Sequence, residues 1–224
     1  MSELTIAVDG PGSAGKGTVA RGVARVLGYQ YIDTGAMYRA VALRALREGI
    51  SWDDHADLAT LTASLSFRFP FDGDVLRVLV DGEDVTGLVR SDEIGMGASM
   101  VSKVPGVRAA LLGLQRELGA NGGIVMDGRD IGTVVLPDAE LKVYLDADLE
   151  VRALRRYEEL VRRGQPASLG SVRDALKKRD RQDMERELAP LKPAEDAVVL
   201  DTSEMTVRQA IDTVVRLARE RRGA

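Results

Sequence analysis

Nine residues near the start of the chain form a glycine-rich loop suited to binding phosphate. The segment Gly10-Pro11-Gly12-Ser13-Ala14-Gly15-Lys16-Gly17-Thr18 follows an apolar run, residues 4–8, and precedes a helical pattern. Glycine leaves the backbone free of side-chain clashes, so successive N–H groups can converge on phosphate oxygens at the positive end of the helix dipole. Lys16 would add a mobile positive charge toward the β and γ phosphates. The pattern therefore predicts a site for a nucleoside triphosphate.

The residue after the loop lysine departs from the commonest form of such a loop. Gly17 stands where many phosphate-binding loops carry the serine or threonine whose hydroxyl binds Mg²⁺, and Thr18 follows it. The sequence thus leaves the metal ligands open. We expect Mg²⁺ to be held mainly by phosphates and water, with Thr18 or Asp127 as candidate protein ligands.

Arginine supplies most of the 31 basic residues, so position has to separate ligand-binding residues from surface ones. Four clusters lie where strands end or on one helix face: Arg39 in the segment 33–39, Arg129 in the segment 127–130, Arg152 with Arg155 and Arg156, and Arg179 with Asp183 and Arg186. Taken singly, each cluster matches a solvated helix face with salt bridges. Together with the glycine-rich loop they predict two phosphate groups that face one another.

Such a pair of phosphates has a catalytic meaning. The second pKa of a phosphate monoester is about 6, so a phosphate acceptor is already anionic at neutral pH and needs little general-base help. The protein must relieve repulsion between two polyanions, align them and exclude water. Arginine suits this task because it is always charged and has a planar, bidentate fork.

Acid–base catalysis by histidine has little support. The only histidine, His55, follows the polar helix start 51–54, and we expect it to have no catalytic role. We expect its neighbour Trp52 to be a packing anchor rather than a platform for a base.

Short apolar runs alternate with longer helical patterns along the chain. This alternation predicts an α/β fold, a parallel five-stranded sheet with helices on both faces, with strands at 4–8, 29–32, 124–126, 141–145 and 198–200. Ligands of such sheets bind beyond the carboxyl ends of the strands, where this chain has Asp9, Asp33, Asp127, Asp146 and Asp201.

Departures from the alternation predict two added lobes. Between residues 66 and 85 the pattern favours antiparallel strands with a turn at Asp81-Gly82. Around 162–170, Gly164, Pro166 and Gly170 separate two arginine-bearing helices, as the hinges of a lid would.

Two further patterns predict where helices begin and end. Thr206 with Gln209 predicts a capping box that opens a C-terminal helix. Ser171 with Asp174 predicts the start of another helix, which Pro190 would end.

Length and composition limit the function classes. The 224 residues suffice for one domain carrying lobes. A net charge of −4 gives no global field for a nucleic-acid polymer or an anionic membrane, so we expect a small anion as partner. The lack of cysteine excludes disulfides and agrees with a reducing compartment. With no apolar span and no signal-peptide layout at the N-terminus, we expect a cytoplasmic protein, and nothing requires more than a monomer.

Several segments together resemble the bacterial cytidylate kinases, over nearly the whole chain. They are residues 9–18, Asp33-Thr34-Gly35-Ala36-Met37-Tyr38-Arg39, Asp127-Gly128-Arg129-Asp130-Ile131-Gly132-Thr133, Pro137-Asp138-Ala139, residues 177–183 and Ala189-Pro190-Leu191. The loop alone would indicate only the broader nucleoside monophosphate kinases. The resemblance implies a fold of the P-loop NTPase type, with core 1–60, 104–150 and 190–224, a monophosphate-binding insert at about 61–103, and a lid with flanking helices at about 151–189.

The resemblance also implies the substrates and the residues that bind them. ATP with Mg²⁺ would be the phosphoryl donor, and CMP or dCMP the acceptor. Lys16, Asp127, Arg129, Arg179 and Arg186 would form the catalytic set. Arg39, Arg129 and Arg186 would contact the acceptor phosphate, Arg179 and Asp183 the ribose and phosphate, Ser99, Arg108 and Asp130 the cytosine, and Thr34 the acceptor; Arg152, Arg155 and Arg156 would close over the donor phosphates. Cytosine offers an amino donor for Asp130, with O2 and N3 as acceptors for Ser99 and Arg108.

Three alternative functions were weighed against this one. A GTPase needs an N-K-x-D element, and the single asparagine, Asn121, has no such surroundings. A kinase for a neutral hydroxyl, such as a shikimate or gluconate kinase, would need a base, for which Asp33 or Asp127 could serve. A nucleotide-binding regulator without turnover would be expected to lack Lys16 or Arg129, and both are present.

Overall fold

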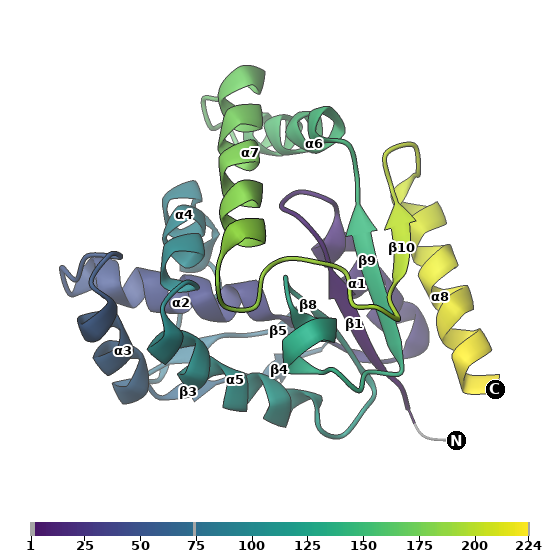
Figure 1. Cartoon of the computed structure of the whole chain (residues 1–224), viewed down its shortest axis with the longest axis horizontal. Coiled ribbons are helices and arrows are strands. Elements are labelled where there is room, and N and C mark those ends of the chain that lie inside the picture. The colour runs from purple at the N-terminus through teal and green to yellow at the C-terminus, as the bar shows by residue number, and fades with distance from the viewer. Residues whose placement is uncertain (1–2, 74, 224) are drawn as a thin grey trace.

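Five parallel strands form the centre of the molecule, which is described from a computed structural model covering residues 3–73 and 75–223. They are β1 (Thr5–Asp9), β2 (Gln30–Asp33), β8 (Ile124–Asp127), β9 (Leu141–Asp146) and β10 (Val198–Asp201), in the order β10-β9-β1-β8-β2 (Figure 1). All five strands predicted from the apolar runs are confirmed. Each strand ends on the predicted aspartate, so five carboxylates lie along one edge of the sheet.

Helices cover both faces of this sheet, as predicted. On one face, α1 (Lys16–Leu27) and α8 (Val207–Gly223) pack over Ile6 and Val8. On the other face, α2 (Thr34–Arg47), α5 (Pro105–Gly119) and a short π-helical turn η2 (Ile131–Val135) pack over Ala7. Successive β1 side chains point to opposite faces, and both faces are buried, which is why its central residues Ile6, Ala7 and Val8 are all apolar.

The predicted antiparallel lobe is present between α2 and α5. It comprises α3 (His55–Ser64), the sheet β3 (Phe67–Arg68), β6 (Leu79–Val80) and β7 (Glu83–Asp84), the pair β4 (Phe71–Asp72) and β5 (Val75–Leu76), a 3₁₀ turn η1 (Leu88–Arg90) and α4 (Asp92–Val101). Asp81 and Gly82 form the predicted turn with positive φ angles of 51° and 85°. Val80 and Val85 belong to the same buried core as α2, and the indole N–H of Trp52 donates to the Ala42 carbonyl, so Trp52 anchors packing.

Two helices form the lid region beside the carboxyl ends of the strands (Figure 1). They are α6 (Leu149–Arg162) and α7 (Leu169–Glu185), which share a small apolar core of Ala153, Leu160, Val172 and Leu176. Gly164 and Pro166 lie in the link between them. Gly170 lies inside α7, so its prediction as a hinge is wrong.

The start of α7 differs from the predicted start at Ser171. The capping residue is Ser168, three residues before the predicted start. Its hydroxyl accepts the N–H of Ser171 at 3.2 Å, a main-chain donor in the first turn that has no partner within the helix. The capping box at the start of α8 is confirmed: the Thr206 hydroxyl accepts the N–H of Gln209, whose side chain accepts the N–H of Thr206.

The end of α7 also differs from the sequence prediction. The helix stops at Glu185, before Pro190, because the chain turns back through Ala189 at φ 49° and the Leu191 N–H donates to the Asp183 carbonyl. Arg186 has extended backbone angles and is not part of the helix. The predicted helix face shared by Arg179, Asp183 and Arg186 therefore holds only for the first two. In the described part of the chain, no helix has the length and apolarity to cross a bilayer.

Candidate active site

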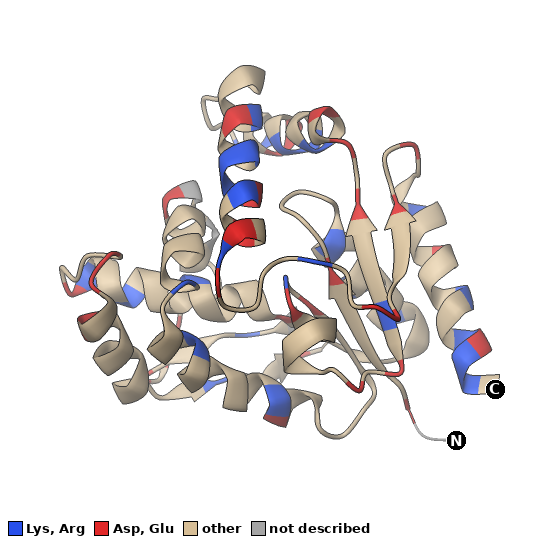
Figure 2. Cartoon of the chain, in the orientation of Figure 1, with Lys and Arg blue, Asp and Glu red and all other residues tan. Residues whose placement is uncertain are grey.

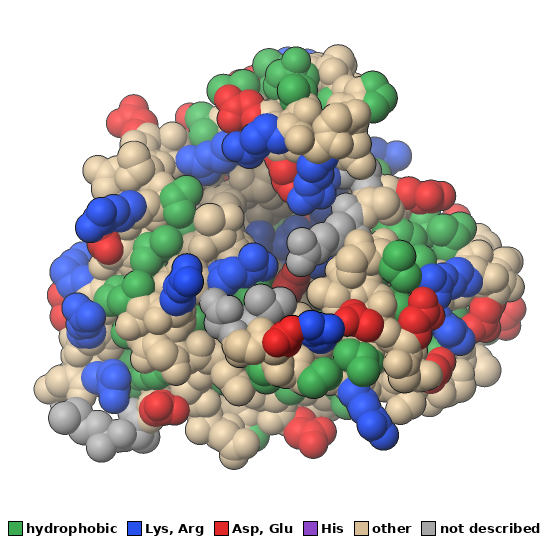
Figure 3. Space-filling model, turned by 180° about the vertical axis from the view of Figure 1, so that it is seen from behind, with side chains coloured by type: hydrophobic (Ala, Val, Ile, Leu, Met, Phe, Trp, Pro, Cys, Tyr) green, Lys and Arg blue, Asp and Glu red, His purple; other side chains and the backbone are tan. Residues whose placement is uncertain are grey.

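An open cavity of about 1460 Å³ lies among the carboxyl ends of the strands, the inserted lobe and the lid. Pockets for one small ligand usually measure about 300–1,000 Å³, so this cavity has room for two ligands. Figure 3 shows the hollow with lysine and arginine side chains around it. Charged residues follow one another along α7 from its second turn to its lower end (Figure 2).

Most of the predicted site residues line this cavity. They are Ser13, Ala14, Gly15, Lys16, Gly17, Thr18, Thr34, Arg39, Ser99, Asp127, Arg129, Asp130, Arg155, Arg156, Arg179, Asp183 and Arg186. Gly10, Pro11, Gly12, Arg108 and Arg152 do not line it. The structure thus brings together side chains from positions 13 to 186.

The glycine-rich loop joins β1 to α1 in a backbone shape that its residues impose. Gly10 has φ 146°, and a Cβ there would lie 1.9 Å from the Leu145 carbonyl oxygen, so only glycine fits. Gly15 has φ 91° and precedes α1 without any side-chain cap on the helix. The first N–H groups of α1 are therefore available to an anionic ligand.

Lys16 is the buried cation of the loop. Its ammonium donates to the Pro11 carbonyl at 2.6 Å, which curls the side chain back over the loop. Burial and the nearby Arg129 lower the pKa of Lys16 to about 7, although Asp127 opposes this shift. A phosphate against the ammonium would favour its charged form.

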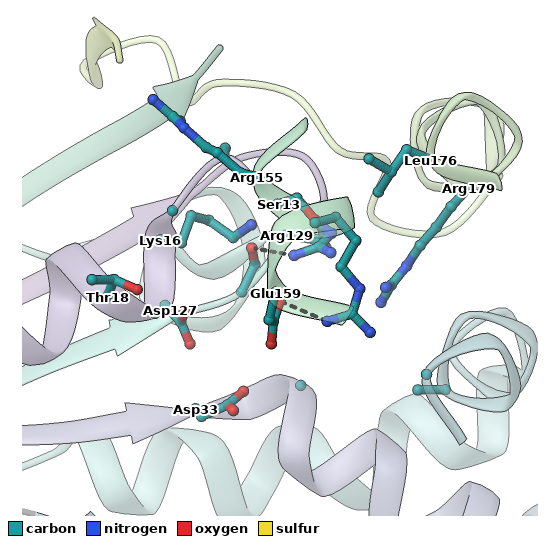
Figure 4. A pocket seen from close by; sticks show the side chains of 18 of the residues that line it. Ser13, Lys16, Thr18, Asp33, Asp127, Arg129, Arg155, Glu159, Leu176 and Arg179 are labelled. Atoms are coloured by element: carbon teal, nitrogen blue, oxygen red, sulfur yellow. Dashed lines mark hydrogen bonds and ion pairs between the residues drawn. The ribbon is translucent and has the colours of Figure 1, made fainter. Parts of the chain in front are cut away.

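Asp127 faces Lys16 from the end of β8, with Thr18 close by on α1 (Figure 4). Burial and the carboxylate of Asp33 raise the pKa of Asp127 to about 7. A Cβ on Gly17 would lie 3.1 Å from the Tyr31 hydroxyl and 3.4 Å from Asp127 Oδ2. A side chain at position 17 would therefore be tightly packed, and the Tyr31 hydroxyl would have to shift by a few tenths of an ångström.

The oxygens of Asp127 and Thr18 fit Mg²⁺, which prefers carboxylate and other oxygen ligands and keeps several waters or phosphate oxygens. Among residues 3–73 and 75–223, no group of three or more histidine, cysteine, aspartate or glutamate residues could hold a metal ion by itself. A metal here would therefore depend on oxygens that the nucleotide supplies.

Aspartates from other elements pair with the arginines that were predicted to bind the acceptor. Arg39 pairs with Asp33 at 2.6 Å. Arg129 pairs with Asp183 at 2.8 Å. Arg186 pairs with Asp130 at 3.0 Å, and Arg108 bonds to the second oxygen of the same carboxylate. The guanidinium groups are thus held in place by carboxylates, which for Arg108, Arg129 and Arg186 lie 22 to 56 positions away in the sequence.

Burial and neighbouring charges shift the pKa values of two side chains on α7, Asp183 and Arg179. Burial works against ionisation of the Asp183 carboxyl, but Arg129 and Arg179 outweigh it and hold its pKa below the usual range. Burial and Arg129 lower the pKa of Arg179 to about 10. The buried Nε of Arg179 has no hydrogen-bond partner among the described residues, and the side chain points from α7 into the cavity (Figure 4). This N–H donor is available to a ligand.

The residues predicted to bind cytosine lie between α4 and β8. The Ser99 hydroxyl is 3.4 Å from Asp183 Oδ1, and Ser102, the residue directly after α4, donates to the Ser99 carbonyl. Ser102 is also 3.5 Å from Arg186 and lines the cavity, a residue that the sequence analysis missed. Its spacing of three from Ser99 was the available signal.

Thr34 is the first residue of α2, directly after the end of β2. Its hydroxyl donates to the Asp127 carbonyl at 2.8 Å. A Cβ on Gly128 would lie 2.7 Å from that hydroxyl, so Gly128 permits the close approach of the two segments.

Asp9 was predicted to lie near the chemistry and has a positioning role. Both oxygens of its carboxylate accept main-chain N–H groups at 2.8 Å, from Ile131 and Gly132. Burial raises its pKa to about 6. The two bonds fix the π-helical turn that follows Arg129 and Asp130, which was not foreseen from the sequence.

The lid arginines do not form the predicted single stack. Arg155 donates to the Thr202 carbonyl at 2.6 Å, Arg156 pairs with Glu159 at 2.6 Å, and both line the cavity. Arg152 turns the other way: it is buried against Asp180, which supplies the anion that the sequence analysis had assigned to a polyphosphate.

This fold and this site define a kinase of the P-loop class, in which a glycine-rich loop and lysine lie between the first strand and helix of a parallel sheet and a helical lid stands beside them. The model of the cytidylate kinase family matches residues 6–220, and the chain belongs to that family.

Individual relatives agree with this assignment. The chain is 50% identical over 218 residues to a cytidylate kinase of Geobacter sp. strain M21, covering 97% of this chain and 94% of that one. It is 45% identical over 222 residues to a cytidylate kinase of Geobacillus sp. strain WCH70, covering 99% of each. Its fold is similar to the crystal structure of an uncharacterized protein from Eubacterium ventriosum, with a TM-score of 0.55, 11% identity, and coverage of 97% and 99%.

Proposed function

We propose that the protein transfers the γ-phosphoryl group of ATP to CMP or dCMP, giving ADP and the corresponding diphosphate. The observation that carries the proposal is the position of Arg129. Its Nη2 lies 4.0 Å from the Cβ position of Gly12 in the phosphate loop, while its Nε pairs with Asp183 beside Arg179. One guanidinium therefore stands between the donor loop and the acceptor arginines.

The residues divide between the two substrates. The amides at the start of α1 and Lys16 would bind the donor phosphates, with Arg155 and Arg156 over them. Arg39, Arg129 and Arg186 would bind the acceptor phosphate, and Arg179 would use its free Nε. These cations relieve the repulsion between two polyanions and stabilise charge on the transferred group. Mg²⁺, when bound by Asp127, Thr18 and the phosphates, would neutralise further charge.

Cytosine would be bound by Asp130, Arg108 and Ser99. Asp130 is held between Arg108 and Arg186, so its carboxylate is oriented to accept from the amino group of the base. Arg108 does not line the cavity, but its buried Nη1 has no partner in residues 3–73 and 75–223, so a small turn of the side chain when CMP binds would give O2 or N3 a donor. Uracil presents a carbonyl where cytosine presents its amino group, so a carboxylate there disfavours UMP.

The predicted insert, lid and core would each serve particular substrates. The insert at about 61–103 would serve the acceptor. The lid at about 151–189 would serve both substrates, with Arg155 and Arg156 toward the donor and Arg179, Asp183 and Arg186 toward the acceptor, and the remaining segments would form the shared core. A monomer and a cytoplasmic location stay predictions from the sequence.

A kinase for a neutral hydroxyl remains the main competitor. That chemistry needs a base near the acceptor, and Asp33 is ill-suited: burial opposes its ionisation, but Arg39 holds its pKa below the usual range and engages it at 2.6 Å. Several arginines at the acceptor position also favour an anionic acceptor.

A coupled ADP-release assay across acceptors tests the proposal. The panel should contain CMP, dCMP, UMP and AMP, with shikimate and gluconate as neutral-hydroxyl acceptors. We expect ADP release with CMP or dCMP at least about tenfold faster than with the others, a difference of about 1.4 kcal/mol. Faster release with a neutral-hydroxyl acceptor or with AMP would contradict the proposal.

A further inference from the structure

Arg152 and Asp180 form a buried ion pair between the two lid helices. Arg152 Nη1 lies 2.5 Å from Asp180 Oδ2, and the side chains are only 8% and 10% exposed. Arg152 Nε also donates to the Ala147 carbonyl at 2.8 Å, just before α6. The roles proposed above leave this pair unused. We infer that Arg152 and Asp180 are positioning residues that couple the lid to the phosphate loop through Gly12, an inference that rests on the proposed use of that loop for the donor.

Both polar main-chain groups of Gly12 contact the pair. The Gly12 carbonyl accepts from Arg152 Nη1 at 3.1 Å, and the Gly12 N–H donates to Asp180 Oδ1 at 3.4 Å. A Cβ on Gly12 would lie 3.3 Å from Leu176 Cδ2, so α7 packs directly against the loop. The lid therefore holds the middle of the phosphate loop from both sides.

The same peptide group connects the pair to Lys16. The Pro11 carbonyl accepts from the Lys16 ammonium at 2.6 Å, and the N–H on that peptide is the one that Asp180 engages. A peptide group is planar and rigid, so turning its N–H also turns its carbonyl. Asp180 and Lys16 thus bind opposite sides of the Pro11–Gly12 peptide group. A displacement of α7 would therefore reorient the Pro11 carbonyl, which positions the Lys16 ammonium.

A contribution to folding stability does not by itself explain the Arg152–Asp180 pair. Replacing a buried ion pair by apolar residues is often neutral or stabilising, because desolvation offsets the attraction. Orientation is a better explanation, since Asp180 is next to Arg179 and three residues before Asp183 on α7. The pair fixes those acceptor-side groups relative to the donor loop.

A double variant separates orientation from stability. R152M/D180L removes both charges together, so it leaves no unpaired buried ion. The matched control is R181M/E185L, which removes an exposed ion pair of the same helix. Each protein is measured for thermal midpoint, kcat, the KM of ATP and of CMP, and amide hydrogen exchange of the peptide covering residues 9–16.

For R152M/D180L we expect a thermal midpoint near that of the parent, with kcat lowered and the KM of ATP raised about tenfold each, the effect of losing one charge-assisted contact. The KM of CMP should change much less, and the loop peptide should exchange faster. The control should match the parent in every measurement. Parental kcat, KM of ATP and loop exchange in R152M/D180L would overturn the inference.

A second variant covers the case in which the double variant does not fold. R152K keeps the charge, but its single ammonium cannot reach Ala147, Gly12 and Asp180 together as the guanidinium does. We expect the same split between the KM values and faster loop exchange; parental values would overturn the inference. If the parent protein itself shows no phosphoryl transfer to CMP, the proposed function fails, while loop exchange still decides the coupling.

Discussion

The replacement Arg129→Ala removes the side chain that stands between the two proposed phosphates. Arg129 is partly buried, and Asp183 raises the pKa of its guanidinium against the effect of burial, so the group stays charged. A charge-assisted hydrogen bond contributes about 1.5–3 kcal/mol, and a guanidinium can make two at once. The loss is therefore about 3–6 kcal/mol, and at about 1.4 kcal/mol per factor of ten we expect kcat/KM to fall at least about a hundredfold.

The same replacement leaves Asp183 with fewer partners, so stability has to be measured beside activity. Arg179 still lies close enough to favour the Asp183 carboxylate, and we expect a lowered thermal midpoint but a folded protein at 25 °C. The assay is ADP release with CMP, well below the midpoint. Arg181→Ala, an exposed arginine of the same helix as Asp183, is the control and should keep parental turnover. Parental kcat/KM in folded Arg129→Ala would remove Arg129 from the mechanism.

Three further predictions concern other parts of the account. His55→Ala should leave kcat/KM and the denaturation midpoint nearly unchanged, because His55 is exposed at the start of α3; a large loss of activity at unchanged stability would show that His55 takes part. The pH profile of kcat/KM for MgATP should be bell-shaped with its maximum near pH 7, since Asp127 loses its negative charge below about 7 and Lys16 its positive charge above about 7 in the free enzyme; a flat profile from pH 5 to 9 would contradict these assignments. Gly10→Ala should lower the free energy of unfolding by at least about 1–3 kcal/mol in urea titrations, because its Cβ would overlap the Leu145 carbonyl; a parental midpoint would refute this reading of the loop.

The sheet could be predicted because each strand is specified by a short segment of neighbouring residues. An apolar run of four to six residues that ends in aspartate, such as β8 or β9, forms a strand buried on both faces whatever else the chain does. The carboxyl edge then follows from the parallel order, and with it the positions of the loop, Asp33 and Asp127. The capping box at Thr206 was predictable for the same reason.

The missed features depend on contacts between distant segments. The sequence places Arg152 on the same helix face as Arg155 and Arg156. Its side chain instead pairs with Asp180, which lies on another helix. Arg186 left the predicted helix face because Leu191 folds back onto α7.

The carboxylates that orient the arginines could not be paired from one sequence. Partners such as Arg129 and Asp183, or Arg108 and Asp130, are set by how the lobes close around the sheet. The sequence therefore predicts which residues bind the substrates, while the structure shows which neighbours hold them.

The most direct test of two anionic substrates bound end to end is a crystal structure with CMP and a magnesium-bound, non-hydrolysable ATP analogue. The account predicts the γ-phosphate of the analogue between Lys16 and Arg129, facing a CMP phosphate bound by Arg39 and Arg186. Donor phosphates away from the glycine-rich loop, or these arginines turned outward to solvent, would contradict it.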